Sequence, residues 1–364
     1  MLLWLMDAFS TFPIQRLVTY ISFRSLMAML TSFLIGLLLG KKLINIIYRL
    51  NLRDRAREYG DISSKNKSGT PTMGGLIIFI SFLASVLFWG KLNNFFITVI
   101  LFAGFWFTAL GFMDDYLKSV RGSSDAGMSR SLKLVFQSLF GLILAFLVLS
   151  PSSTPFGADV TKLFVPFVKN PVLDLSYFYY PFIILVIVGI SNSINFADGL
   201  DGLATVPVSL LAAVYAIFAY IIGNMRAAEY LLFPFFNGAG EMVIALSALV
   251  GALAAFLWFN TYPAEIFMGD TGSLFLGGVI GTSAVLLKKE LLFLIAGGVF
   301  VIEFLSVFIQ DYIGIKLMKR RILYRAPIHH TFQFMGIGEP KIVVRFWIIA
   351  VIFMMVSLIS IKLR

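Results

Sequence analysis

The stretch FYYPFIILVIVGISNSINFADGLDG, residues 178–202, is a long apolar run that ends in a polar, glycine-rich turn. Its first part, 178–195, carries no Asp, Glu, Lys or Arg. A helix needs about 20 mostly apolar residues to cross the hydrocarbon core of a bilayer. The run therefore predicts a membrane-spanning helix, and the polar turn that follows it is predicted to lie at one face of the membrane.

Similar apolar runs recur along the whole chain and predict about ten transmembrane helices. Hydrophobic residues make up 59% of the 364 residues and charged residues 13%, whereas soluble proteins average about 45–50% and about 25%. We therefore predict an all-α polytopic membrane protein, in which residues 1–364 form a single integral-membrane domain. The predicted spans are 25–47, 72–89, 94–113, 132–150, 178–195, 202–222, 240–259, 269–287, 291–315 and 343–361.

The composition also excludes several classes of protein. The chain has no Cys, so a disulfide framework, a thiolate nucleophile and a Cys-based zinc site are excluded. Its net charge of +10 agrees with basic cytoplasmic loops and attraction to anionic lipid head groups. Nucleic-acid binding would need a soluble basic face, and the sequence pattern contains none.

The orientation of the chain follows from its Lys and Arg residues. The side that holds the loops after the first, third, fifth, seventh and ninth spans carries 19 of them, and the opposite side carries 10. Basic residues favour the cytoplasmic side. We therefore predict that both termini are periplasmic and that the basic loops are cytoplasmic.

Five Asp residues fall on this predicted cytoplasmic face: Asp114, Asp115, Asp198, Asp201 and Asp270. Carboxylates close to hydrocarbon are costly and are usually functional or paired. In GFMDDYLK (111–118) the alternative is a pair of solvated carboxylates at a helix end.

In SINFADGLDG (193–202), the spacing of Asn195, Asp198 and Asp201 would place all three on one face if the stretch is helical. The alternative is a polar turn between two spans.

In NTYPAEIFMGDTGS (260–273), Asp270 stands at the start of a predicted span. As an N-cap it would have a purely structural role. The functional interpretation is that the helix start offers backbone N–H groups to a phosphate, beside which a carboxylate suggests Mg²⁺. The chain has no GxxxxGK[ST] motif, which argues against a P-loop ATPase.

The two His residues stand together in APIHHTFQ (326–333). Zinc would need three or four ligands, so contact with a phosphate or sugar, or acid–base work, is the better interpretation of His329 and His330. The alternative is a solvated pair. Lys67 and Thr70, in SSKNKSGTPTMGG (63–75), suit anion binding or simply a flexible basic loop.

The motifs GFMDDYLK, NFADGLDG, FMGDTGS and PIHH occur together in the order found in polyprenyl-phosphate N-acetylhexosamine-1-phosphate transferases. Over essentially its whole length the chain resembles one family of this group, the phospho-N-acetylmuramoyl-pentapeptide-transferases (the MraY family). That family usually has three consecutive His followed by an aromatic residue and Glu, whereas this chain has Thr331 and Gln333 at two of these positions.

The resemblance implies that undecaprenyl phosphate attacks UDP-MurNAc-pentapeptide in the presence of Mg²⁺, giving lipid I and UMP at the cytoplasmic face of the bacterial inner membrane. The two substrates, the lipid bilayer and a second copy of the chain in a homodimer are the partners we expect. The resemblance makes Asp270 the best metal ligand, with Asp115 close to the metal and Asp114 as the base or, less favoured, a nucleophile. His329 and His330 would contact the sugar-peptide side of the donor.

The resemblance also implies a set of binding residues. The residues expected to contact substrate are Lys67, Thr70, Lys118, Lys133, Asn195, Asp198, Leu200, Asp201, Asn260, Phe267 and Gln310, with Phe267 stacking on uracil. Gln310 shares one helix face with Glu303, which is equally interpreted as an internal hydrogen-bonding group.

Two alternatives stay open from the sequence. A sister transferase would use UDP-GlcNAc or a related UDP-sugar with the same metal chemistry. An ion-coupled transporter would place its polar groups near the middle of the bilayer, often within inverted repeats. The carboxylates here lie at one predicted face instead, which disfavours the transporter.

Overall fold

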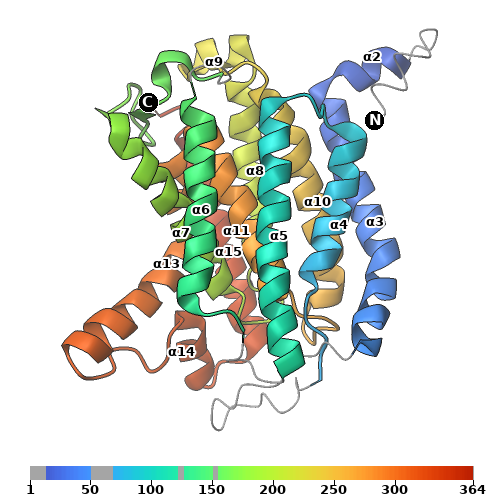
Figure 1. Ribbon diagram of the computed structural model, residues 1–364, viewed down its shortest axis with the longest axis vertical. Helices are drawn as coiled ribbons and strands as arrows, with labels where there is room; N and C mark the ends of the chain where they lie inside the picture. Colours follow the sequence, from blue (N-terminus) through green and yellow to red (C-terminus); the bar gives the residue numbers. More distant parts are fainter. Residues whose placement is uncertain (1–13, 51–68, 122–126, 151–154, 364) are drawn as a thin grey trace.

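The computed structural model describes residues 14–50, 69–121, 127–150 and 155–363. Long helices dominate it (Figure 1). They are α3 (Ile21–Arg49), α4 (Gly75–Trp89), α5 (Phe95–Arg121), α6 (Arg130–Leu149), α7 (Tyr179–Ala197), α8 (Thr205–Ile222), α10 (Met242–Asn260), α11 (Gly269–Leu286), α13 (Gly298–Phe308) and α15 (Glu339–Ile359).

Shorter elements connect these helices. The short helices are α2 (Ile14–Thr19), α9 (Met225–Leu231), α12 (Phe293–Ala296), α14 (Ile328–Phe334), the 3₁₀ turns η2 (Gly157–Asp159), η3 (Ser176–Phe178), η4 (Ala239–Glu241) and η5 (Glu290–Leu292), and the π-helical segment η6 (Ile309–Leu317). One antiparallel pair, β1 (Lys162–Leu163) with β2 (Leu173–Asp174), lies between α6 and α7. The sequence pattern predicted none of these short elements as separate ones, although η5, α12 and η6 overlap the predicted span 291–315.

Each of the ten predicted spans overlaps a helix of the structure. Eight helical segments of the described residues are long and apolar enough to cross a membrane. The all-α polytopic membrane fold is therefore confirmed. Most boundaries agree with prediction to within four residues, and two predictions differ by more: α5 continues to Arg121 rather than ending at 113, and the predicted span 291–315 is divided among η5, α12, α13 and η6.

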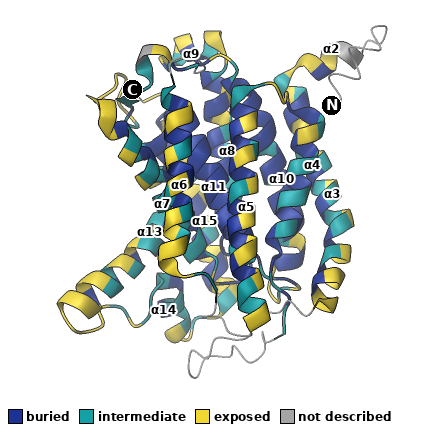
Figure 2. Ribbon diagram, in the orientation of Figure 1, coloured by how far each residue is buried: buried dark blue, intermediate teal, exposed yellow. Residues whose placement is uncertain are grey.

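Helix α11 lies at the centre of the bundle, between α4, α5 and α7. Every residue from Thr271 to Leu286 is buried (Figure 2). Small residues allow this close packing, because a Cβ added at Gly111 would lie 2.2 Å from the carbonyl oxygen of Asp270, and one added at Gly75 would lie 2.1 Å from the amide nitrogen of Gly272. Close contact between backbones at small residues is a common way to pack helices in membranes. It places Asp270, at the start of α11, against the end of α5.

The two ends of the bundle differ. At the lower end of Figure 1 lie α14 and the C-terminal end of α5, whereas α2 and the C-terminal end of α15 lie at the upper end. The helix formed by α13 and η6 leans away from the bundle at the lower end, and many of its outer residues are exposed (Figure 2). The predicted acidic clusters therefore lie at the end where α13 diverges.

Candidate active site

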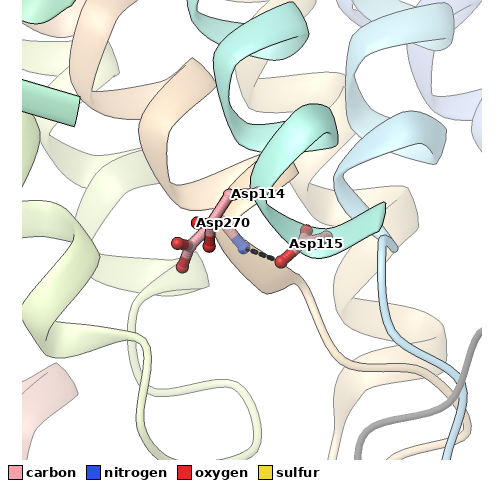
Figure 3. A group of neighbouring side chains, drawn as sticks. All are labelled: Asp114, Asp115 and Asp270. Carbon is pink, nitrogen blue, oxygen red and sulfur yellow. Dashed lines mark hydrogen bonds between the residues drawn. The ribbon is translucent and has the colours of Figure 1, made fainter. Parts of the chain in front are cut away.

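Three carboxylates meet where α5 ends and α11 begins. Asp114 and Asp115 come from α5 and Asp270 from the first turn of α11 (Figure 3). One oxygen atom from each carboxylate lies within 4.8 Å of the other two. The structure thus brings together two predicted motifs that are about 155 residues apart in the chain.

Two lysines lie between Asp114 and Asp270. The ammonium group of Lys118 is 2.6 Å from Asp114 Oδ2 and 3.1 Å from Asp270 Oδ2. That of Lys133, from the first turn of α6, is 2.9 Å and 2.6 Å from the same two oxygens. The side chains of Lys118 and Lys133 are 23% and 21% exposed, so the charged cluster is not sealed within the protein.

Asp115 has a different environment from Asp114. Its Oδ1 accepts a hydrogen bond from the amide of Asp270 (Figure 3). Its Oδ2 accepts from the amide and hydroxyl of Thr271. Asp115 thus caps the start of α11 from a neighbouring helix and holds Asp270 in place.

This arrangement corrects one prediction. The sequence pattern suggested that the start of α11 offers its N–H groups to a phosphate, or that Asp270 caps the helix. In the structure α11 begins at Gly269, so Asp270 lies within its first turn, and the amides of Asp270 and Thr271 already donate to Asp115. Because these donors are occupied, the lysines are the better phosphate contacts.

The segment 71–75 lies along the residues that precede Asp270. Phe267 donates its amide to the carbonyl of Pro71 and accepts from the amide of Gly74, and Gly75 donates to the carbonyl of Met268. Phe267 itself is half-buried at this edge of the site. Thr70 is half-buried just before this segment, whereas Lys67 lies outside the described residues.

The stretch that contains Asn195, Asp198 and Asp201 is helical only at its start. Helix α7 ends at Ala197, and Asp198 follows with φ −85° and ψ 57°. The prediction of a three-residue helical stripe is therefore wrong, because the chain turns before Asp201. Asn195 still reaches the carboxylate cluster, donating to Asp270 Oδ1 at 2.9 Å and to Ser273 Oγ at 2.8 Å.

Asp198 is half-buried between Asn195 and the turn that follows. Loss of hydration, together with the negative charges of Asp270, Asp115 and Asp201, raises its pKa well above the ordinary value. A carboxyl group in this environment favours its protonated form, which can donate a hydrogen bond to a neutral acceptor.

The other predicted residues of this region support the loops. Asp201 Oδ2 accepts from the amide of Ala264, and Leu200 is buried in a small core against α15. Asn260 accepts from the amide of Gly202 at 2.9 Å and donates to the carbonyl of Ile266 at 2.9 Å. The side chain of Asn260 therefore joins two loops of the site by hydrogen bonds to their backbones.

This geometry predicts that Asn260→Asp lowers stability. A carboxylate keeps the acceptor for Gly202 but loses the donor to Ile266, and leaving a buried polar group without its partner costs about 1–3 kcal/mol. We expect a lower midpoint of thermal unfolding in detergent. Asn224→Asp is the matched control, because the exposed side chain of Asn224 accepts a hydrogen bond through Oδ1 from the amide of Ala227 at the start of α9, and a carboxylate can accept the same bond. Equal midpoints for the two variants would contradict the supporting role of Asn260.

The two histidines lie at the start of α14 and differ in exposure. His329 is fully buried, whereas His330 is half-buried with its Nδ1 2.8 Å from Gln333 Oε1. Thr331 donates its hydroxyl to the carbonyl of Arg325 and accepts from the amide of the same residue. The two residues that depart from the family pattern, Thr331 and Gln333, thus hold the loop before α14 and contact His330.

The side chain of Gln310, in η6, also makes hydrogen bonds to backbone amides. Its Oε1 accepts from the amides of Ile322 at 3.2 Å and Leu323 at 2.9 Å. The side chain therefore holds the loop that leads to the histidines. No pattern in the sequence revealed this contact.

Comparisons with known proteins agree with the geometry. The model of glycosyl transferase family 4 matches residues 97–288, which include all three clustered carboxylates. The phospho-N-acetylmuramoyl-pentapeptide-transferase signature 1 matches residues 67–79, which include the segment 71–75 described above. The phospho-N-acetylmuramoyl-pentapeptide-transferases of two strains of Leptospira biflexa serovar Patoc are each 42% identical over 370 residues, covering 99% of this chain and 99% of theirs. The chain therefore belongs to the family of phospho-N-acetylmuramoyl-pentapeptide-transferases.

Proposed function

We propose that this protein transfers phospho-MurNAc-pentapeptide from UDP-MurNAc-pentapeptide to undecaprenyl phosphate, which yields lipid I and UMP. The observation that carries the proposal is the cluster of Asp114, Asp270, Lys118 and Lys133 at one end of a membrane-embedded bundle. A lipid-linked acceptor requires a reaction site at the membrane surface. The transfer of a phosphoryl group requires cationic groups that stabilise charge on the phosphates.

The cluster fits a divalent cation such as Mg²⁺. Its donors are carboxylate oxygens that lie within 4.8 Å of one another, and Mg²⁺ prefers oxygen ligands from one or two carboxylates together with phosphates. Asp270 and Asp115 would hold the ion, because Oδ1 of Asp115 accepts one hydrogen bond from α11 and keeps a second lone pair, which leaves Asp114 to act as the base. When bound, Mg²⁺ would stabilise negative charge on the phosphates.

The side chains around the cluster then divide the work. Lys118 and Lys133 bind the phosphates, and Asp114 accepts the proton of the acceptor phosphate. Asn195 holds Asp270 in place. Asp198 and Phe267 bind the uridine part of the donor, and Lys67 and Thr70 contact its phosphates from the segment before α4. His330 contacts the sugar-peptide part.

We further propose that this end of the bundle faces the cytoplasm of a bacterium, in its inner membrane. The excess of Lys and Arg in the loops at this end supports the orientation. Ten spans with both termini on the periplasmic side agree with α2 and the C-terminal end of α15 lying at the opposite end. The homodimer stays a prediction.

The proposal is tested with purified protein, undecaprenyl phosphate, Mg²⁺ and a UDP-sugar, with UMP release as the readout. We expect release with UDP-MurNAc-pentapeptide and little with UDP-GlcNAc, and we expect EDTA to abolish it until Mg²⁺ is restored. Release that requires UDP-GlcNAc would instead identify the sister transferase. Release that is insensitive to EDTA would overturn the metal assignment.

A further inference from the structure

Glu303 is a buried acid that the proposed reaction does not use. It lies in α13, and its side chain is fully buried. Neither of its carboxylate oxygens has a hydrogen-bond partner among the described residues. Among the described residues, its ionic contact is with His329, whose Nδ1 lies 3.1 Å from Oε2. An unpaired carboxylate at membrane depth is costly, so this contact is the natural reason for the residue to be retained.

The backbone fixes the position of both partners. Ser306, one turn after Glu303, accepts from the amide of Ile328 at 3.0 Å and donates to the carbonyl of Glu303 at 2.6 Å. The turn of α13 that carries Glu303 is therefore attached to the start of α14, which carries His329. This connection holds the two backbones close together, and both side chains are fully buried between them.

The other side of the His329 ring lies against the turn that follows α7. A Cβ added at Gly199 would lie 2.2 Å from Nε2 of His329, so the imidazole occupies the space that a side chain at 199 would need. Gly199 directly follows Asp198, which we propose as a donor-binding residue. Nε2 has no hydrogen-bond partner among the described residues.

We propose that Glu303 is a positioning residue for donor binding, which acts through His329. A carboxylate beside one ring nitrogen fixes the tautomer and orientation of an imidazole. The Glu303 carboxylate lies 3.1 Å from Nδ1 of His329 and favours the tautomer that carries its proton on Nδ1, which leaves the lone pair of Nε2 against the 198–202 turn, beside Gly199. His330, in contrast, contacts the neutral side chain of Gln333. This inference rests on the proposed function of the 198–202 turn.

The chain contains only two His, so its ring nitrogens can be observed individually by NMR of ¹⁵N-histidine-labelled protein. His330→Gln assigns the two sets of signals. We expect a protonated Nδ1 for His329 and a clear change of its signals in Glu303→Gln, with His330 serving as the internal reference. A wild-type His329 protonated only on Nε2, or signals that Glu303→Gln leaves unchanged, would overturn the inference. This measurement does not depend on transferase activity.

The kinetic readout separates positioning from simple stabilisation. Loss of a carboxylate that orients a metal-bound histidine typically costs about 10–100-fold, and that range is the upper bound we expect for His329. We expect Glu303→Gln to raise the KM for UDP-MurNAc-pentapeptide while the KM for undecaprenyl phosphate stays constant, and Glu303→Asp to recover part of the loss. A fall in kcat alone, with both KM values unchanged, would assign Glu303 a purely structural role and overturn the inference.

Glu290→Gln is the matched control. Glu290 is also buried, but its carboxylate accepts a hydrogen bond from the hydroxyl of Tyr179. Tyr179 begins α7, whereas Asn195 lies near the end of the same helix. We expect its substitution to leave the histidine signals and both KM values as in the wild type. Changes equal to those of Glu303→Gln would show that loss of any buried carboxylate perturbs the site, and the inference would fall. If wild-type protein shows the Nδ1 signature but no transfer, the proposed function fails while the pairing stands.

Discussion

Asp270→Asn is expected to lower the turnover of UDP-MurNAc-pentapeptide by about 10²–10³, the usual loss when one electrostatic contact to a transition state is removed. Asp270 links three side chains of the site, because its carboxylate contacts Lys118, Lys133 and Asn195. The amide would keep the size of the side chain but remove its charge. UMP release at saturating Mg²⁺ is the measurement.

Asp174→Asn provides the control for this loss. Asp174 is exposed in β2, where its Oδ1 accepts from the amide of Ser176, and an amide oxygen can accept the same bond. We expect unchanged turnover. If Asp270→Asn retains more than about a tenth of wild-type turnover, the loss falls short of one electrostatic contact, and Asp270 has no role in holding the metal.

Asp114→Asn is expected to lose about 10²–10⁴ of the rate at low pH, which is the usual contribution of a general base. Asp114 Oδ2 lies between the same two lysines that contact Asp270. An acceptor phosphate attracted by these lysines would arrive beside this oxygen. Because the second pKa of a phosphate monoester is about 6, the acceptor loses its proton without help as the pH rises. The defect of the variant should therefore shrink at alkaline pH.

A nucleophilic role for Asp114 makes a different prediction. A covalent intermediate would let the enzyme exchange labelled UMP into the donor without any acceptor lipid. We expect no exchange by enzyme stripped of endogenous lipid. Robust exchange, together with an Asp114→Asn variant that is inactive at every pH, would replace direct attack by a two-step mechanism. Glu229→Gln, at an exposed position in α9, is the matched control for charge removal.

Much of the fold could be predicted because hydropathy marks each long helix. The exceptions have local physical causes. The apolar run of α5 ends before Asp114, but the helix itself continues to Arg121. Backbone hydrogen bonds within a helix can continue beyond the hydrocarbon core of the bilayer. The division of the span 291–315 involves Gly297, where α12 gives way to α13. The short β pair contains only two residues in each strand, too few for a pattern.

The members of the site were easier to predict than their individual tasks. Lys118 stands four residues after Asp114, so their contact follows from helical spacing. The contacts of Asp115 with α11 and of Asn260 with two loops depend on the approach of distant backbone segments, which no motif encodes. Because adjacent Asp114 and Asp115 have the same residue type, only the structure separates a carboxylate facing lysines from one capping a helix.

The central place of α11 has a consequence for how the chain is made. Its three main neighbours, α4, α5 and α7, all leave the ribosome before it does. Helix α11 carries Asp270 in its first turn and is not among the eight helical segments of the described residues that are apolar enough to be candidate spans by themselves. We expect the earlier helices to remain in the membrane with a shared face unfilled until α11 is inserted. Its insertion brings Asp270 to Asp114 and Asp115, before the later elements η6 and α14 add Gln310 and the two histidines.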